Sequence, residues 1–198
     1  MAEKKYTPMM QHYLKMKEEN PDSILFYRLG DFYEMFFEDA KLVSQELDLV
    51  LTGRSAGVEE KVPMCGIPFH AANSYIQRLV KKGYKVAICE QLEDPSSAKG
   101  LVDRGIIKII TPGTYMDATM DAKSTNYMAS CDVSSFEITV IYCELSTGEL
   151  KYQTLQRSLV ALQKALLEQN VSELVCPVTM LSLMHISEPT RRRGISYA

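Results

Sequence analysis

Short apolar runs alternate with segments of helical period over residues 8–112, and this alternation limits the fold more than any other feature. Thr7 and Pro8 have the residue types of a helix cap and a first helical residue, and Asn20-Pro21 marks the end of that helix. Residues 24–29 then form a mostly apolar run typical of a buried strand. Strands that alternate with helices indicate an α/β or α+β domain. We therefore predict a small mixed β-sheet flanked by helices in residues 1–112.

The elements of this domain can be predicted range by range. Gly30-Asp31 interrupts the first strand, and Asp31 is placed to cap a second helix that runs to about Glu46. The later elements expected from the pattern are strands at 47–51, 64–67, 85–90 and 106–111, a polar loop at 53–61, a helix at 71–82 and a turn at 94–97.

The pattern changes after residue 112. Residues 113–124 are polar and lack an apolar period, so we interpret them as a linker. The elements expected beyond it are strands at 127–133, 136–145, 149–155 and 173–176 and a helix at 156–169. A unit this small rarely closes a core on its own. Residues 125–180 are therefore interpreted as a partial α/β domain.

Residues 181–198 show no periodicity that links them to the preceding pattern. We interpret them as a tail that is foreign to the native protein, and the chain as an N-terminal fragment of a longer one. The alternative is a basic C-terminal arm built on Arg191, Arg192 and Arg193.

The composition excludes several classes of protein. No apolar run approaches the length that spans a bilayer, and the N-terminus lacks the apolar region of a signal peptide. Five widely spaced cysteines without a C-x-x-C pair indicate free thiols in a reducing, cytoplasmic compartment. The formal net charge of −3 argues against a protein that binds DNA through bulk electrostatic attraction.

Motifs for catalysis are weak. No G-x-x-x-x-G-K-[ST] phosphate loop is present, so the sequence encodes no ATPase of that class. His12 and His70 are far apart and not near a cysteine pair, which gives no support for zinc. Cys65 and His70 could be paired as nucleophile and base, but Cys65 is better interpreted as a buried residue.

The acidic group Asp31, Glu34, Glu38 and Asp39 leaves one enzymatic alternative open. Carboxylates this close could hold Mg²⁺ in a small metal-dependent nuclease. The competing interpretation is that acidic residues near a helix N-terminus complement the helix dipole.

Aromatic residues crowd into the run from Gly30 to Phe37. We expect Tyr33, Phe36 and Phe37 on one side, which leaves Phe32 and Glu34 on the other. The pattern alone favours Phe32 as a core residue, as in a non-catalytic interaction domain, so its burial separates the hypotheses.

Five segments occur in an order and spacing that point to a known family. They are Tyr6–Met10, Phe26–Phe36, Pro63–Ala71, Val86–Gln91 and Ile110–Gly113. Together they resemble the N-terminal mismatch-binding domain of the MutS family of bacterial DNA mismatch-repair proteins. The resemblance covers residues 6 to about 116, and more weakly the start of the following connector domain to about 178. It implies an incomplete RNase H-like connector in residues 125–180.

The resemblance implies a role for Phe32 and Glu34 in recognising mispaired or unpaired bases. The aromatic side chain would wedge into the minor groove and stack on the base, and the glutamate would hydrogen-bond the edge of that base. It also places Arg54 and the segment Met64, Cys65, Gly66 and Ile67 near the DNA backbone. Lys108 is a cationic candidate from the sequence alone.

The remaining expectations also come from the resemblance. The chain itself would catalyse no reaction and hold no cofactor, because the family's ATPase, with its ATP and Mg²⁺, lies beyond it. Its partners would be double-stranded DNA with mismatches or small loops, a second copy in the full-length homodimer and the repair protein MutL. No membrane is expected, and the protein would be cytoplasmic and nucleoid-associated.

Overall fold

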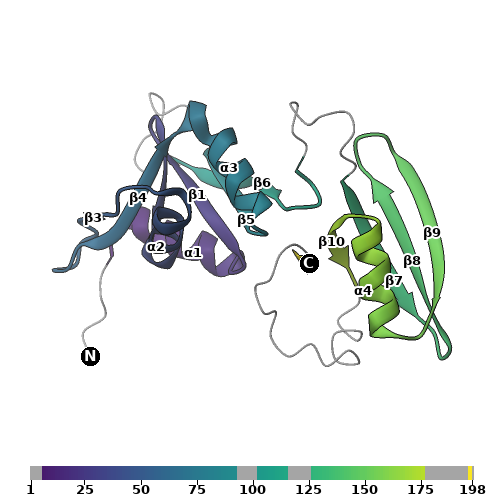
Figure 1. The fold of residues 1–198 in the computed structure, drawn as a ribbon. Helices are drawn as coiled ribbons and strands as arrows, with labels where there is room; N and C mark the ends of the chain where they lie inside the picture. Colours follow the sequence, from purple (N-terminus) through teal and green to yellow (C-terminus); the bar gives the residue numbers. More distant parts are fainter. Residues whose placement is uncertain (1–5, 93–101, 116–125, 177–195, 198) are drawn as a thin grey trace. The chain divides into compact units, whose positions relative to one another are not determined.

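The computed structural model describes residues 6–92, 102–115, 126–176 and 196–197. The chain forms two compact units with a division after Ile110, and residues 81–83 are grouped with the second unit (Figure 1). Each unit has its own sheet, so each is described by itself. None of the described helices is both long enough and apolar enough to cross a membrane.

The first unit is a six-stranded mixed sheet with helices packed on it. Its strand order is β3-β4-β2-β1-β5-β6, in which β1 and β5 are parallel and the other neighbours antiparallel. The predicted mixed sheet flanked by helices is confirmed. Its elements are α1 (Pro8–Glu19), β1 (Ser23–Leu29), β2 (Phe32–Phe36), α2 (Phe37–Leu47), β3 (Thr52–Arg54), β4 (Val62–Pro68), η1 (Phe69–Ala71), α3 (Ala72–Lys81), β5 (Lys85–Gln91) and β6 (Arg104–Ile110).

The prediction that Asp31 caps a helix running to about Glu46 is wrong in its first part. Residues 32–36 form strand β2, which pairs with β1 on one side and β4 on the other. Gly30 has a φ of +58°, and the two-residue turn Gly30-Asp31 folds β2 back on β1 as a hairpin. Helix α2 begins only at Phe37 and has no side-chain cap at its start. A capping signal could therefore not locate this helix.

The strand predicted at residues 47–51 is also wrong. Leu47 is the buried last residue of α2, and Asp48, with a φ of +56°, ends the helix in the left-handed conformation. The side chains of Val50 and Leu51 are exposed. The strand comes later, as β3, which begins at Thr52 and extends into the range 53–61 that was expected to be a loop. The other predicted elements of this unit are confirmed with small shifts at their ends, and the predicted turn at 94–97 lies outside the described residues.

The core under α1 fixes the orientation of β2. Met10 and Tyr13 of α1 are fully buried against Leu25, Tyr27 and Phe36. The rings of Tyr13 and Phe36 meet edge to face with their centroids 4.9 Å apart. On the opposite face α2 covers β4, where the Cys65 thiol donates to the Ala40 carbonyl at 3.5 Å. The sheet is therefore covered by helices on both faces around its centre.

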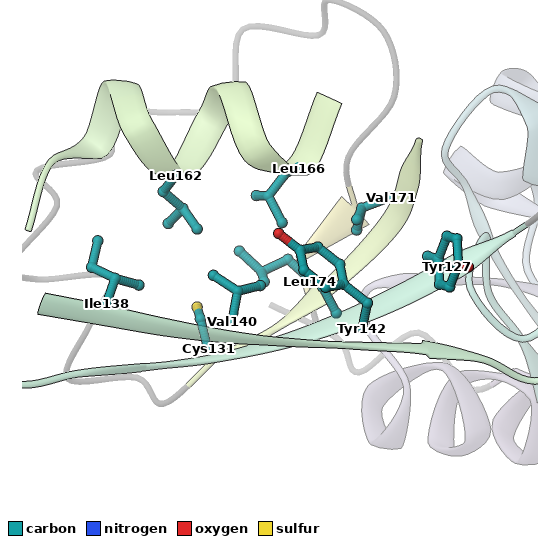
Figure 2. Packing of buried hydrophobic residues seen from close by; sticks show 10 residues of the cluster. Tyr127, Cys131, Ile138, Val140, Tyr142, Leu162, Leu166, Val171 and Leu174 are labelled. Atoms are coloured by element: carbon teal, nitrogen blue, oxygen red, sulfur yellow. The ribbon is translucent and has the colours of Figure 1, made fainter. Parts of the chain in front are cut away.

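The second unit is a sheet with one helix on it. Its strand order is β11-β10-β7-β8-β9, and the buried side chains of α4 meet those of β7, β8 and β10 (Figure 2). The elements predicted here are confirmed, with α4 shorter than expected. They are β7 (Tyr127–Val133), β8 (Glu137–Glu144), β9 (Glu149–Gln156), α4 (Leu159–Glu168) and β10 (Val171–Val175). The structure adds the two-residue strand β11 (Ser196–Tyr197), which the sequence pattern did not predict.

A buried carboxylate ties the chain that follows β6 to this second sheet. Glu173 of β10 is only 2% exposed. Its Oε2 accepts hydrogen bonds from the Thr111 hydroxyl and from the Gly113 amide, the latter at 3.0 Å. The first residues of the predicted 113–124 linker are thus held in place, and residues 116–125 lie outside the described structure. Of the predicted tail 181–198, the described part is Ser196–Tyr197, which pairs with β10.

Candidate nucleic-acid interface

Phe32, Glu34 and Phe36 share one face of β2, because side chains alternate along a strand. Phe36 is fully buried against α1, whereas Phe32 at the start of the strand is 46% exposed. Tyr33 points to the opposite face with Met35 and is buried. The expected grouping of Tyr33 with Phe36 and Phe37 is therefore wrong. The interpretation of Phe32 as a core residue is also wrong.

The position of Phe32 follows from the hairpin. It is the first residue of β2 after the Gly30-Asp31 turn, opposite Leu29 in β1 and Pro68 in β4. The Phe69 amide donates to the Asp31 carbonyl at 2.9 Å, which ties η1 to this turn. A large aromatic side chain is thus presented by a rigid strand end and not by a loose loop.

Glu34 lies between the exposed and the buried phenylalanine and is paired with Arg54 of β3. The Arg54 Nη1 donates to the Glu34 Oε2 as a salt bridge. The side chain of Glu34 is 16% exposed and that of Arg54 is 37% exposed, so the guanidinium is the more accessible partner. Gly66 of β4 faces Glu34 across the ladder. A Cβ built on Gly66 would lie 3.5 Å from the Glu34 Cγ, so the glutamate leans over this glycine toward β3.

A second exposed aromatic side chain, which the sequence interpretation did not single out, follows the end of β4, and its partner Arg28 lies opposite Tyr33 on the other face of the sheet from Phe32. Phe69 is 41% exposed and follows directly on Pro68, the partner of Phe32. The guanidinium of Arg28 stacks over the Phe69 ring at 3.7 Å and is paired with Glu90 at 3.4 Å. Both Arg28 and Phe69 occur in segments that carry the family resemblance, and this was the signal that could have identified them.

Some of the residues predicted to contact the DNA backbone lie on the same face of the sheet as Glu34, and others do not. Arg54, Gly66 and the half-buried Met64 lie on the Glu34 face, whereas Cys65 and Ile67 are buried with their side chains toward the interior. Lys108 is exposed on β6, at the opposite edge of the sheet from β3. The strands β1 and β5 separate β6 from β2, so Lys108 is not brought together with Phe32 and Glu34.

The four carboxylates of the nuclease alternative do not converge. Asp39 is buried, where it accepts from the Leu25 amide at 2.9 Å and pairs with Lys17 at 2.9 Å. Glu38 pairs with Lys41 on the exposed side of α2. Among the described residues no group of three or more His, Cys, Asp or Glu side chains is placed to hold a metal ion. The geometry thus lends this alternative no support.

The pairing of Cys65 with His70 as nucleophile and base is likewise unsupported. Burial of the thiol, together with the nearby Asp39, raises the pKa of Cys65 to about 12. A thiol of that pKa stays protonated at neutral pH and is a poor nucleophile. His70 lies in the short 3₁₀ turn η1, beside the ring of Phe69.

Comparison with known proteins agrees with this geometry. Residues 7–119 match the family model for MutS domain I. The DNA mismatch repair protein MutS of Clostridium botulinum (strain Loch Maree / Type A3) is 54% identical over 177 residues, which cover 84% of this chain and 19% of that protein. The corresponding protein of Clostridium tetani (strain Massachusetts / E88) is 58% identical over 146 residues, which cover 73% of this chain and 17% of that protein.

The fold and these matches place the chain in the class of DNA mismatch-repair proteins. It belongs to the MutS family, and residues 7–119 are its domain I. The chain spans about a fifth of the length of the relatives named above.

Proposed function

We propose that the first unit recognises mispaired or unpaired bases in double-stranded DNA by inserting Phe32 into the minor groove. The observation that carries the proposal is the exposure of Phe32 on a rigid strand end, two residues from a carboxylate on the same face. A side chain that stayed in the core could not reach a base. Glu34 would meet the edge of the displaced base.

The physical basis is the cost of deforming the duplex. An inserted apolar side chain unstacks a base step at a cost of a few kcal/mol, which the extra contacts of a kinked duplex offset. A mispaired base stacks and pairs poorly, so the same deformation costs less there. Specificity then arises without reading a sequence. A carboxylate suits the base edge because it accepts the donors that a mispair leaves unsatisfied.

We extend the proposal to the rest of the protein by the same family membership. The second unit would be the start of the family's RNase H-like connector. ATP and Mg²⁺ would be bound by parts of the relatives that this chain does not span, and the chain itself would catalyse no reaction. The full-length protein would form a homodimer, with contacts mostly in those parts, and MutL would be its repair partner. The protein would act in the cytoplasm, at the nucleoid.

The deciding experiment is Phe32→Ala in this chain, with Phe136→Ala as the matched control. Phe136 is 88% exposed in the second unit, so its removal has a similar effect on solubility. Binding to a fluorescent duplex with one mismatch and to its matched counterpart is measured by anisotropy at low salt. Loss of one stacked base, worth about 1–3 kcal/mol, should weaken mismatch binding about 5- to 150-fold in Phe32→Ala, with little change for the matched duplex.

The outcome that contradicts the proposal is equally specific. The assignment fails if Phe32→Ala keeps the parent's ratio of mismatch to matched affinity, or if it changes no more than Phe136→Ala does. The parent chain itself should bind a mismatched duplex only with a Kd of about 1 µM or weaker at ~150 mM salt, because it is net acidic and offers few phosphate contacts. A nanomolar Kd at that salt would contradict this expectation.

A further inference from the structure

The salt bridge between Arg54 and Glu34 joins two residues that the proposed function assigns to different parts of DNA. The guanidinium is a ligand for a backbone phosphate, and the carboxylate is a ligand for a base. In the DNA-free chain the Arg54 guanidinium and the Glu34 carboxylate are bound to each other. The salt bridge engages the Arg54 Nη1 and the Glu34 Oε2 and holds the glutamate toward β3.

We propose that Arg54 controls the access of Glu34 to DNA by exchanging partners. In the free chain Arg54 holds the carboxylate over Gly66, and a phosphate of the duplex backbone then takes the place of that carboxylate on the guanidinium. Glu34 is released toward the mispaired base only after this exchange. The inference rests on the proposed function and makes Arg54 a positioning residue for Glu34 as well as a phosphate ligand.

The accessibility of the two side chains sets the order of events. With 37% of its side chain exposed, Arg54 is open to an approaching phosphate, whereas Glu34, 16% exposed, is largely covered. The duplex therefore meets the cation first. Bidentate geometry suits a guanidinium to phosphate as well as to carboxylate, so the exchange replaces one favourable pair with another.

The sheet explains how the two residues meet. Arg54 belongs to β3 and Glu34 to β2, with β4 between them. At the β4 position that faces Glu34 the residue is Gly66, and no side chain stands in the path of the glutamate. The Arg54 guanidinium also lies 5.9 Å from the ring centroid of Phe36, a buried residue on the same face of β2 as Glu34.

The exchange is energetically accessible because the pair is partly exposed. Ion pairs of this kind contribute little to stability in water. A phosphate contact can therefore replace the carboxylate without a large penalty. A fully buried pair would resist the same exchange.

The test follows the side chains directly by NMR in the 198-residue chain. The Arg54 Nε–Hε signal and the Glu34 carboxyl carbon are observed while matched duplex, without any mismatch, is added at low salt. Both signals should move together, because a phosphate alone suffices for the exchange. In the free Arg54→Ala variant the Glu34 carboxyl signal should already lie at the released position, and added duplex should move it little.

Two control variants separate this proposal from the wedge. Arg78→Ala removes another exposed arginine of the first unit, on α3, and should leave the Glu34 signal of the free chain unchanged. Phe32→Ala should still show the exchange with matched duplex, since it removes the wedge alone. Arg54→Ala should weaken binding of both duplexes about 2- to 5-fold, the size of one partly exposed charge contact.

Each outcome decides the proposal. If duplex shifts the Phe32 ring signals but leaves Arg54 and Glu34 paired, the exchange is wrong while the wedge stands. If the Arg54 signal moves and the Glu34 signal does not, Arg54 binds phosphate without releasing the glutamate, and the exchange is again wrong. If neither matched nor mismatched duplex shifts any signal in the chain, both proposals fail together.

Discussion

Both units expose aromatic side chains, and in the first unit one of them shares its strand face with an ion pair. Phe32 shares its strand face with the Glu34–Arg54 pair. In the second unit Tyr152 of β9 is 80% exposed and faces Ile141 across the ladder. That sheet face is opposite to the one covered by α4.

The difference shows that exposure of an aromatic residue does not by itself define a site. Scattered apolar side chains are normal on protein surfaces. A site that recognises a base also needs charged groups whose positions are fixed before the ligand arrives. In the first unit β2 and β3 supply those groups as Glu34 and Arg54, whereas Tyr152 and Ile141 have only apolar side-chain atoms beside the tyrosine hydroxyl.

The largest effect on stability is expected when the buried Phe36 and the exposed Phe32 of β2 are each replaced by alanine. Phe36→Ala should lower the free energy of unfolding of the first unit by about 3–5 kcal/mol, because it empties a fully buried site. Phe32→Ala and Phe136→Ala should each change it by no more than about 0.5 kcal/mol. Urea unfolding followed by the amide signals of each unit tests this. A large loss of unfolding free energy in Phe32→Ala would show that Phe32 is a core residue and would contradict this comparison.

The next effect concerns the buried carboxylate of the second unit. Glu173→Ala leaves the Thr111 hydroxyl and the Gly113 amide without their acceptor, which should cost about 1–3 kcal/mol in that unit. Glu168→Ala, at an exposed ion pair of α4, is the control and should cost about 0.5 kcal/mol or less. Equal losses in the two variants would show that Glu173 does not hold this segment.

The units should also differ in their response to acid. Burial, then Arg104, lowers the pKa of His12, whose Nδ1 lies 2.9 Å from the Tyr27 hydroxyl. A histidine whose folded pKa is lowered adds stability above its unfolded pKa of about 6.5, and this contribution is lost as the pH falls below that value. In the second unit the hydroxyls of Thr147 and Ser146 lower the pKa of Glu144 to about 2.

The stabilising contribution of Glu144 is lost at a lower pH than that of His12. A carboxylate with a lowered pKa adds stability above its unfolded value, and loses it as the pH falls toward the folded value near 2. Between pH 7 and pH 5 we therefore expect the first unit to lose the contribution of His12, whereas the second unit keeps that of Glu144. Urea unfolding at both pH values, with His12→Gln as the variant that abolishes the slope, is the measurement. An unchanged slope in His12→Gln would exclude His12 as its source.

The smallest effect is expected from deleting residues 181–198. Ser196–Tyr197 adds a strand of two residues beside β10, and terminal segments of this kind contribute little. The thermal midpoint should stay within about 2 °C of that of the full chain. A larger drop, monitored by circular dichroism, would mean that this segment supports the second sheet.

The local patterns of the sequence predict most elements but fail at the strand that carries the site. Residues 32–36 are apolar at positions that satisfy both a strand and a helix, and a run this short cannot be assigned by period. The choice is made by pairing with β1 and with the distant β4. Such contacts between segments far apart in sequence are not visible in a local pattern.

The site residues could likewise be predicted only in part from the sequence. Phe32 and Glu34 could be named from the family motif, but the pairing of Glu34 with Arg54 depends on the register of three strands. Phe69 lies in a segment of the family motif, but its exposure depends on how η1 is tied to the hairpin turn, which a local pattern does not show. The sequence thus predicts which chemical groups are present, and the sheet determines which of them meet.

The exposed edge strand β6 affects how readily molecules of this protein aggregate. It pairs only with β5 among the described strands, and Ile107, Lys108 and Ile109 are exposed along it. A β-branched, apolar edge strand with free backbone groups is a template for edge-to-edge aggregation, and a single charge in its middle opposes such stacking. Lys108 therefore helps to set how concentrated the protein can become before strands of different molecules begin to pair.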